Sequence, residues 1–204
     1  MPAIGRNAHG RRHHGRMDLG LPIETERLRL RRLVSGDLAA MHAIESRPEV
    51  VRWLYWEPRT ESEVRLALDR RIAWPLEHGF TVGAELLATG ELIGHVGLTV
   101  EPAHRQGEIG FIFHPAHQGN GYATEAAAAV LALGFDHYGL HRVSGRLEAR
   151  NAASARVLEK LGMRLEAHLR ENEWVKGEWQ SELVYALLAR EWRRRGAGAS
   201  GGFR

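Results

Sequence analysis

The hydrophobic residues of the chain alternate between strand-like and helix-like spacing. Residues 24–34 alternate leucine with arginine, which predicts a half-buried strand with one face in water. Residues 37–46 then place apolar side chains at helical spacing, and Pro48 begins a second short helical stretch. At Thr60 a capping box, a threonine followed three residues later by a glutamate, opens a longer helix. We expect Pro75 to kink or shorten that helix.

From residue 80 the hydrophobic period becomes two. Three short runs, at residues 80–88, 91–100 and 107–114, are separated by turn residues and predict an antiparallel meander. Helical composition returns over residues 121–138, and Gly139 is a candidate C-cap for that helix.

The remaining chain adds a strand, a helix and a final strand pair. The strand is predicted over residues 141–149, the helix over 151–162, and the two strands within 163–190 around a lysine-glycine turn. This order predicts an α/β fold with a single mixed, largely antiparallel sheet flanked by helices. We expect one domain over residues 21–192.

Composition places the chain among globular proteins, with 204 residues, 44% hydrophobic and 26% charged. Cysteine is absent, which excludes disulfides, cysteine-ligated zinc and a protein thiol as nucleophile. No apolar run approaches the roughly 18 residues that span a bilayer, and the first twenty residues lack the apolar core of a secretory signal. We therefore expect a cytoplasmic protein that does not bind membranes.

The positive net charge of +3 comes from the ends of the chain. Residues 1–20 and 193–204 each carry four arginines. The residues between these two segments include 20 basic and 24 acidic ones. We expect both ends to be disordered basic tails and Met17 to be an alternative start. Because a phosphate-binding surface normally lies on the folded domain, we expect no nucleic-acid partner.

The most informative segment is residues 107–126, where a strand runs through a glycine-rich loop directly into a helix. Gly119 and Gly121 let the backbone approach a ligand, and the first helical turn offers unpaired N–H groups at its positive end. The segment therefore predicts a phosphate or pyrophosphate site. A P-loop is excluded because no lysine lies near, and a dinucleotide fingerprint fits poorly because Thr124 stands where a third glycine is needed.

The loop sequence Gln-Gly-Asn-Gly-Tyr-Ala at residues 118–123 matches the pattern Gln/Arg-x-x-Gly-x-Gly/Ala, and here the chain resembles the GNAT superfamily of N-acetyltransferases. Residues 151–162 are similar to the second signature of that family. With ETERLRLR near the start, EIGF, GYATEA and a closing EW, the chain resembles the ribosomal-protein-alanine acetyltransferase (RimJ/RimL) branch. The resemblance covers roughly residues 21–192.

The resemblance implies an acetyl-CoA dependent N-acetyltransferase, an acyltransferase that uses acetyl-CoA as co-substrate. A primary amine, either a protein N-terminal α-amine or a small molecule, would attack the thioester directly in a ternary complex. No acyl-enzyme is then needed. In the family, one loop holds the pyrophosphate, an asparagine holds pantetheine, and a strand supplies backbone N–H groups to the oxyanion. The corresponding loop residues here are Gln118, Gly119, Asn120, Gly121, Tyr122, Ala123 and Thr124. The corresponding asparagine is Asn151, and the strand residues are Phe111, Ile112 and Phe113.

Glu108 is the candidate general base. By alternation it shares a face with Gly110 and Ile112, so a small neighbour leaves space for substrate and water. An acid at this place in the family often accepts the amine proton through water. The alternative is a strand-end glutamate in a salt bridge.

The candidate acid for the leaving thiolate is Ser154. Many family members place a tyrosine seven residues after the pantetheine asparagine, but here that position is Leu158. Ser154 lies three residues after Asn151 and therefore on the same helical face. Protonation by solvent is the alternative, because a thiol has a pKa near 8.5.

Trp53, Tyr55 and Trp56 lie where the family builds one wall of the acceptor cleft, although such a cluster also suits a core. The twelve histidines show no ligand spacing, so we expect no metal. A GNAT-fold module that binds coenzyme A or another ligand without turnover is the alternative function. The sequence leaves open the acceptor, the acyl length and the oligomeric state, a homodimer included.

Overall fold

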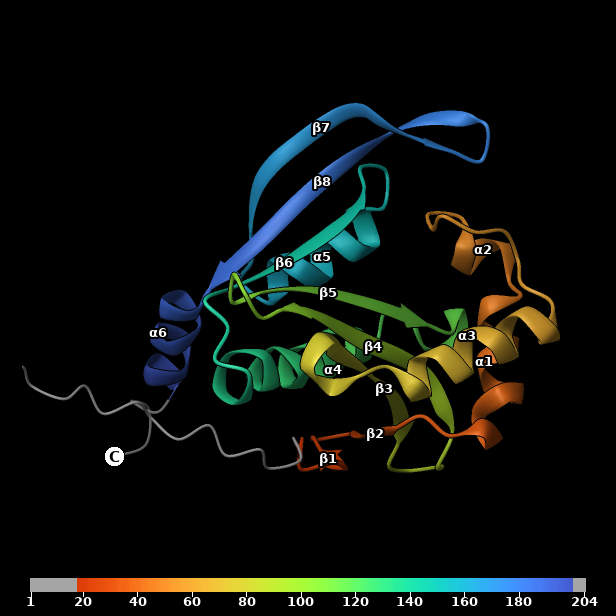
Figure 1. The fold of residues 1–204 in the computed structure, drawn as a ribbon, viewed down its shortest axis with the longest axis horizontal. Helices are drawn as coiled ribbons and strands as arrows, with labels where there is room; N and C mark the ends of the chain where they lie inside the picture. The colour runs from red at the N-terminus through yellow and green to blue at the C-terminus, as the bar shows by residue number, and fades with distance from the viewer. Residues whose placement is uncertain (1–17, 200–204) are drawn as a thin grey trace, which may run out of the picture.

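A computed structural model describes residues 18–199, in which eight strands form one sheet in the order β1-β2-β3-β4-β5-β6-β8-β7 (Figure 1). Neighbouring strands are antiparallel except β5 and β6, which are parallel. The predicted mixed, largely antiparallel sheet is confirmed. The strands are β1 (Ile23–Glu24), β2 (Leu28–Arg32), β3 (Gly79–Leu86), β4 (Leu92–Glu101), β5 (Gln106–Phe113), β6 (Arg142–Glu148), β7 (Arg164–Val175) and β8 (Glu178–Leu188).

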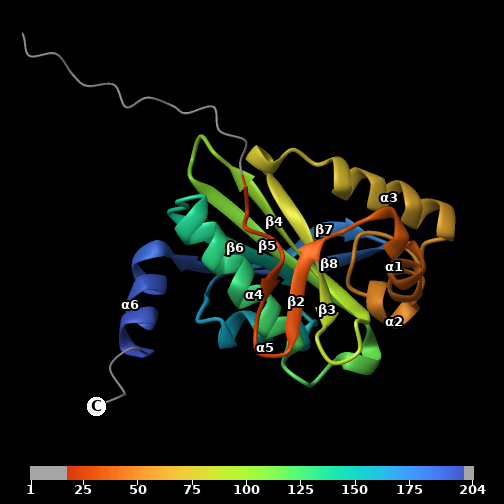
Figure 2. The same ribbon diagram turned by 90° about the horizontal axis from the view of Figure 1, so that it is seen from below.

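Helices cover both faces of this sheet, with α1 and α3 on one side and α4 on the other (Figure 2). The main hydrophobic core lies between α4 and the sheet, and a smaller cluster lies beneath α1 and α3. None of the helices in residues 18–199 is both long and apolar enough to cross a bilayer. The helices are α1 (Leu38–Glu45), α2 (Pro48–Val51), α3 (Glu61–Ala73), α4 (Tyr122–Ala132), α5 (Ala152–Lys160) and α6 (Ala189–Ala199).

Both ends of α3 follow from local chemistry. The Thr60 hydroxyl accepts the Glu63 N–H at 3.4 Å, and the Glu63 carboxylate accepts the Thr60 N–H at 2.8 Å, which confirms the capping box. The helix ends at Ala73 because Trp74, which precedes Pro75, takes an extended conformation. Pro75 therefore shortens the helix.

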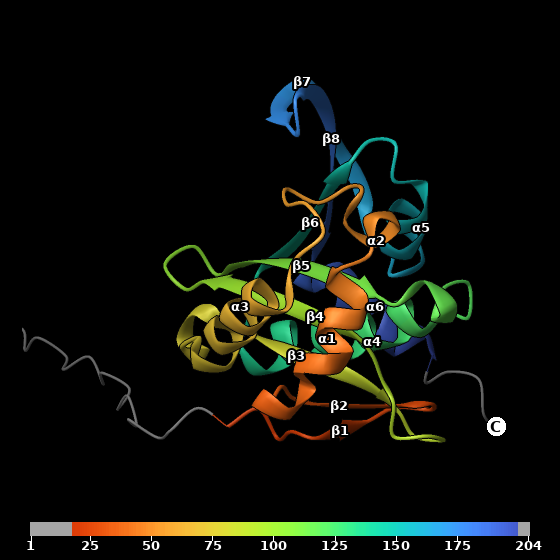
Figure 3. The same cartoon turned by 90° about the vertical axis from the view of Figure 1, so that its right-hand side faces the viewer.

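The sheet divides where β5 meets β6. Their parallel pairing covers only three positions and ends at Glu108 opposite Ser144. Beyond that point β6 continues with β8, and the β7–β8 hairpin extends away from the body of the protein, above α2 (Figures 1 and 3). The last part of β5, residues 109–113, pairs with β4 on its other edge. This division opens the sheet at its centre.

The structure corrects the expected boundaries of the two tails. Leu19 is only 4% exposed and packs into the main core, so the fold begins before residue 21. Residues 193–199 continue α6, because Trp192 stacks on Phe135 with ring centroids 5.6 Å apart and the Arg195 guanidinium donates to the Lys160 carbonyl. Residues 1–17 and 200–204 lie outside the described residues, so disorder there stays a prediction.

Candidate functional site

Two cavities lie side by side at the division of the sheet, each with a volume of about 290 Å³. The first, here called the loop cavity, is lined by the end of β5, the glycine-rich loop and the inner face of α5. The second, here called the acidic cavity, is lined by Glu108 of β5, by β6 and by the β7–β8 hairpin. Trp53 and Leu54, which follow α2, line both cavities. A ligand in one cavity therefore shares this wall with a ligand in the other.

The glycine-rich loop shapes one end of the loop cavity. Gly119 and Gly121 have φ values of 80° and 84°, a left-handed conformation that favours glycine. A Cβ atom at Gly119 would meet no atom within 4 Å, so the loop faces open space. Gly121 is the N-cap of α4, which directs the unpaired N–H groups of the first turn toward that space. This geometry suits an anion such as pyrophosphate.

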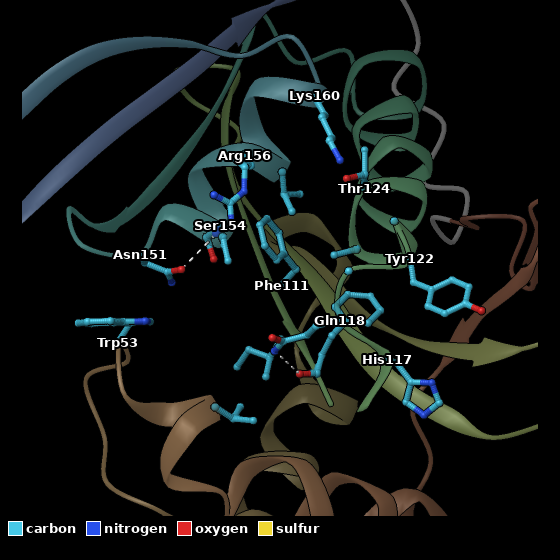
Figure 4. A pocket seen from close by; sticks show the side chains of 18 of the residues that line it. Trp53, Phe111, His117, Gln118, Tyr122, Thr124, Asn151, Ser154, Arg156 and Lys160 are labelled. Atoms are coloured by element: carbon cyan, nitrogen blue, oxygen red, sulfur yellow. Dashed lines mark hydrogen bonds between the residues drawn. The ribbon is translucent and has the colours of Figure 1, made fainter. Parts of the chain in front are cut away.

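Most of the residues predicted to bind the co-substrate meet in the loop cavity. Asn120 does not line it, because its side-chain amide donates to the backbone carbonyls of His117 and Gln118 and so stabilises the loop from within. The residues that do line it are Phe111, Ile112, Phe113, Gln118, Gly119, Gly121, Tyr122, Ala123, Thr124, Asn151 and Ser154 (Figure 4).

Asn151 and Ser154 lie together at the start of α5. The side-chain oxygen of Asn151 accepts the Ser154 N–H at 3.1 Å and caps the helix, which leaves the Asn151 amide hydrogens for a ligand (Figure 4). Leu158 is 2% exposed and packs against Gly145, where a Cβ atom would come within 2.8 Å of it. The position that holds a tyrosine in many family members is therefore part of the core here.

Arg156 and Lys160 were not identified from the sequence. They lie one turn apart on α5 and both line the loop cavity, and Lys160 extends from α5 toward Thr124 of α4 (Figure 4). Within residues 18–199 neither side chain forms an ion pair. Two cations beside the glycine-rich loop suit a ligand with several phosphate groups. Because Arg156 and Lys160 are four residues apart on a predicted helix, the sequence already indicates that they share one helical face.

Four glutamates give the acidic cavity its character: Glu108, Glu148, Glu173 and Glu182. Glu182 pairs with Arg146 at 2.5 Å, and Glu148 pairs with Arg150 at 2.7 Å. In the described part of the chain, no cationic side chain lies within 4 Å of the Glu108 or Glu173 carboxylate. The cavity therefore carries a net negative charge.

Glu108 lies in the acidic cavity near Arg146 and Glu182. Partial burial raises the pKa of its carboxyl group, Arg146 opposes that shift and Glu182 adds to it. The side chain still reaches solvent within the cavity, and a Cβ atom at Gly110 would meet nothing within 4 Å, so the predicted space exists. The absence of an ion pair to Glu108 in residues 18–199 argues against the salt-bridge alternative.

The three aromatic residues separate in the structure. Trp53 lines both cavities, and Tyr55 lines the acidic cavity. Partial burial raises the pKa of Tyr55, and so do the nearby charges of Glu173 and Glu182. Trp56 lines neither cavity and packs beneath the Arg59 guanidinium at 4.2 Å, so its place at the acceptor wall is not supported.

Histidine and carboxylate side chains do not gather as metal ligands in the described residues. No group of three or more could hold a metal ion there.

Comparison with known proteins identifies the family. Residues 27–164 match the family model described as an acetyltransferase (GNAT) domain. The chain belongs to the GNAT family. It is 31% identical over 170 residues to the uncharacterized N-acetyltransferase YnaD of Bacillus subtilis, covering 83% of this chain and 98% of YnaD. As its relatives and its GNAT domain show, it is an N-acetyltransferase.

Two further relatives extend the GNAT comparison. A crystal structure of a GNAT acetyltransferase from Bacillus anthracis superposes with a TM-score of 0.77 at 31% identity, covering 83% of this chain and 99% of that one. The spermidine N(1)-acetyltransferase of Escherichia coli K12 is 27% identical over 168 residues, covering 81% of this chain and 88% of that protein. These relatives do not single out the RimJ/RimL branch.

Proposed function

We propose that this GNAT protein transfers the acetyl group of acetyl-CoA to a primary amine by direct attack in a ternary complex. The observation that carries the proposal is the shared wall of Trp53 and Leu54, with a loop that suits an anion in one cavity and the Glu108 carboxylate, unpaired within residues 18–199, in the other. Donor and acceptor can therefore bind at the same time and meet beside β5.

The residues of the loop cavity fit acetyl-CoA, which supplies an activated acetyl thioester. The Gly119–Gly121 loop, with Arg156 and Lys160, would hold its phosphate groups. Asn151 would hold the pantetheine amides. Backbone N–H groups of residues 111–113 would donate to the oxyanion, because β6 no longer pairs with this part of β5.

The acceptor must lose a proton before its nitrogen can attack the carbonyl carbon. At neutral pH this costs about 1 kcal/mol for an α-amine with a pKa near 8, and about 4.6 kcal/mol for a lysine-like amine near 10.4. Glu108 would accept this proton through a water molecule above Gly110. As the carbon–sulfur bond breaks, the thiolate would take a proton from Ser154 or from solvent.

The charge of the acidic cavity favours an acceptor that carries a second positive charge. Glu173 lies near the tip of the hairpin and lines the same cavity as Glu108, and both carboxylates are unpaired in residues 18–199. Since one relative is named a spermidine N(1)-acetyltransferase, a polyamine is the acceptor that we favour. A protein N-terminal α-amine, as in the RimJ/RimL branch, is the second candidate because it needs only a modest base.

The cytoplasmic location stays a prediction.

An assay of thiol release from acetyl-CoA tests the proposal. The acceptors are spermidine, an aliphatic monoamine of similar length and a peptide with a free N-terminal alanine. We expect the highest kcat/KM with spermidine, and we expect Glu173→Gln to raise KM for spermidine more than for the monoamine. Equal values for spermidine and the monoamine would refute the charge argument. Binding of coenzyme A without turnover of any amine would favour the non-catalytic alternative.

A further inference from the structure

Arg27, in the turn between β1 and β2, reaches across to the glycine-rich loop and α4. Its Nε and Nη2 atoms lie 2.8 and 2.7 Å from Glu125 Oε2, and its backbone N–H donates to Glu125 Oε1 at 2.8 Å. Its Nη1 donates to the backbone carbonyl of Asn120 at 2.9 Å. One guanidinium group therefore joins the loop to the first turn of the helix that follows it.

The same guanidinium lies beside the residues that line the loop cavity. A Cβ atom at Gly121 would lie 3.5 Å from Arg27 Nη2, and the Tyr122 ring centroid lies 4.7 Å from the guanidinium carbon. Gly121 and Tyr122 both line the loop cavity. A movement of Arg27 would therefore alter the part of the loop that faces a ligand.

Glu125 poses an electrostatic problem for this loop. A carboxylate in the first turn stabilises a helix, but it repels an anion bound at the same helix end. Partial burial alone would raise the pKa of Glu125, yet hydrogen bonds from Thr25 and Arg27 lower it, so the group is ionised. The Thr25 hydroxyl donates to Glu125 Oε1 at 2.6 Å and helps to hold the carboxylate against the β1–β2 turn.

We propose that Arg27 is a positioning residue for the phosphate-binding loop, which it holds in shape through Asn120 while it neutralises Glu125. Arg27 does not touch the reacting atoms. The inference rests on the proposed function, because the ligand of the loop is taken to be coenzyme A.

Calorimetry with coenzyme A tests this role in the full chain. We expect Arg27→Met to weaken coenzyme A binding by about tenfold or more, which is about 1.4 kcal/mol. The matched control is Arg29→Met on β2, since Arg29 pairs with Glu24 and Glu85 and does not reach the loop. The control should bind coenzyme A as the wild type does.

Turnover of S-acetylpantetheine, a thioester donor without phosphate groups, separates positioning from a general structural role. Arg27→Met should leave kcat/KM for this donor within about twofold of the wild type. An equal loss of turnover with both donors would overturn the proposal.

A double variant tests the electrostatic part of the proposal. Glu125→Gln keeps the shape of the side chain and removes its charge, so Arg27→Met with Glu125→Gln should bind coenzyme A more tightly than Arg27→Met alone. No recovery would overturn the claim of neutralisation. If Arg27→Met fails to fold, Arg27→Lys serves as the second variant, because it keeps the positive charge but cannot contact Glu125 and the Asn120 carbonyl at the same time. Its affinity for coenzyme A should lie between that of the wild type and that expected for Arg27→Met. Wild-type affinity would overturn the positioning role.

The outcomes also separate this proposal from the proposed function. A wild-type protein that binds no coenzyme A would refute the proposed function, and the role of Arg27 with it. Wild-type binding together with unchanged binding by Arg27→Met would refute the role of Arg27 alone.

Discussion

Replacement of Glu108 by glutamine removes a proton acceptor and preserves the shape of the side chain. In residues 18–199 the Glu108 carboxylate forms no ion pair, so the substitution breaks no salt bridge. A positioned general base contributes about 10² to 10⁴ in rate, or about 3 to 5 kcal/mol in activation free energy. We therefore expect kcat with the best amine to fall by that factor. Coenzyme A affinity should be nearly unchanged, because Glu108 lines the acidic cavity and not the loop cavity.

The pH dependence of turnover carries the more specific prediction. Glu108 must be ionised to accept a proton, and burial raises its pKa, so wild-type kcat/KM should fall with acid at a pH above that of an ordinary glutamate. In Glu108→Gln this acid limb should be absent. As pH rises, more acceptor loses its proton in bulk solvent, so the gap between variant and wild type should narrow by up to about tenfold per unit. The narrowing should end at about pH 8 for an α-amine and about pH 10 for a lysine-like amine.

Stability should move in the opposite direction to activity. The folded Glu108 carboxyl has the higher pKa, so the folded state binds more protons and wild-type stability falls as pH rises from about 4 through the folded pKa. Glu108→Gln has no carboxyl group to ionise at this position, so it does not lose this stability. Its Tm should exceed that of the wild type at neutral pH but not near pH 4. Glu101→Gln, at an exposed end of β4 outside both cavities, is the control for both measurements. Wild-type turnover by Glu108→Gln at neutral pH would refute its role as base.

Three further predictions follow from named contacts. Gly121→Val puts a side chain on a left-handed residue beside Arg27 and should weaken coenzyme A binding by about tenfold or more, measured by calorimetry. Lys160→Met should also weaken coenzyme A binding, and the salt dependence of the dissociation constant should become shallower because one cation is lost. Burial alone would raise the pKa of Glu45, but His95, Arg71 and Arg59 lower it to about 2. Glu45→Gln should therefore cost about 3 to 5 kcal/mol of unfolding free energy at neutral pH. In urea titrations that difference should shrink as pH falls from about 4.5 toward 2, where wild-type Glu45 takes up its proton.

Local sequence patterns were sufficient for most of the elements. The capping box at Thr60, the extended residue before Pro75 and the left-handed Gly121 each depend on neighbours within a few residues. The same holds for the loop signature, whose glycines and helix start appear in the structure as predicted. The error at the C-terminal end had a long-range cause: α6 is stabilised through Trp192 by Phe135, and nothing near residue 193 in the sequence signals that contact.

Thus the sequence by itself determined the fold class, the order of most elements and the backbone conformation of the glycine-rich loop, because each depends on hydrophobic period or local backbone chemistry. Only the tertiary structure decided which charges remain unpaired. Arg27 and Glu125 are 98 residues apart, and Arg146 meets Glu182 across the register of β6 and β8. The two cavities exist because β5 and β6 separate after Glu108. Strand register and the separation of strands arise from the packing of the whole sheet, so no local window of sequence contains them.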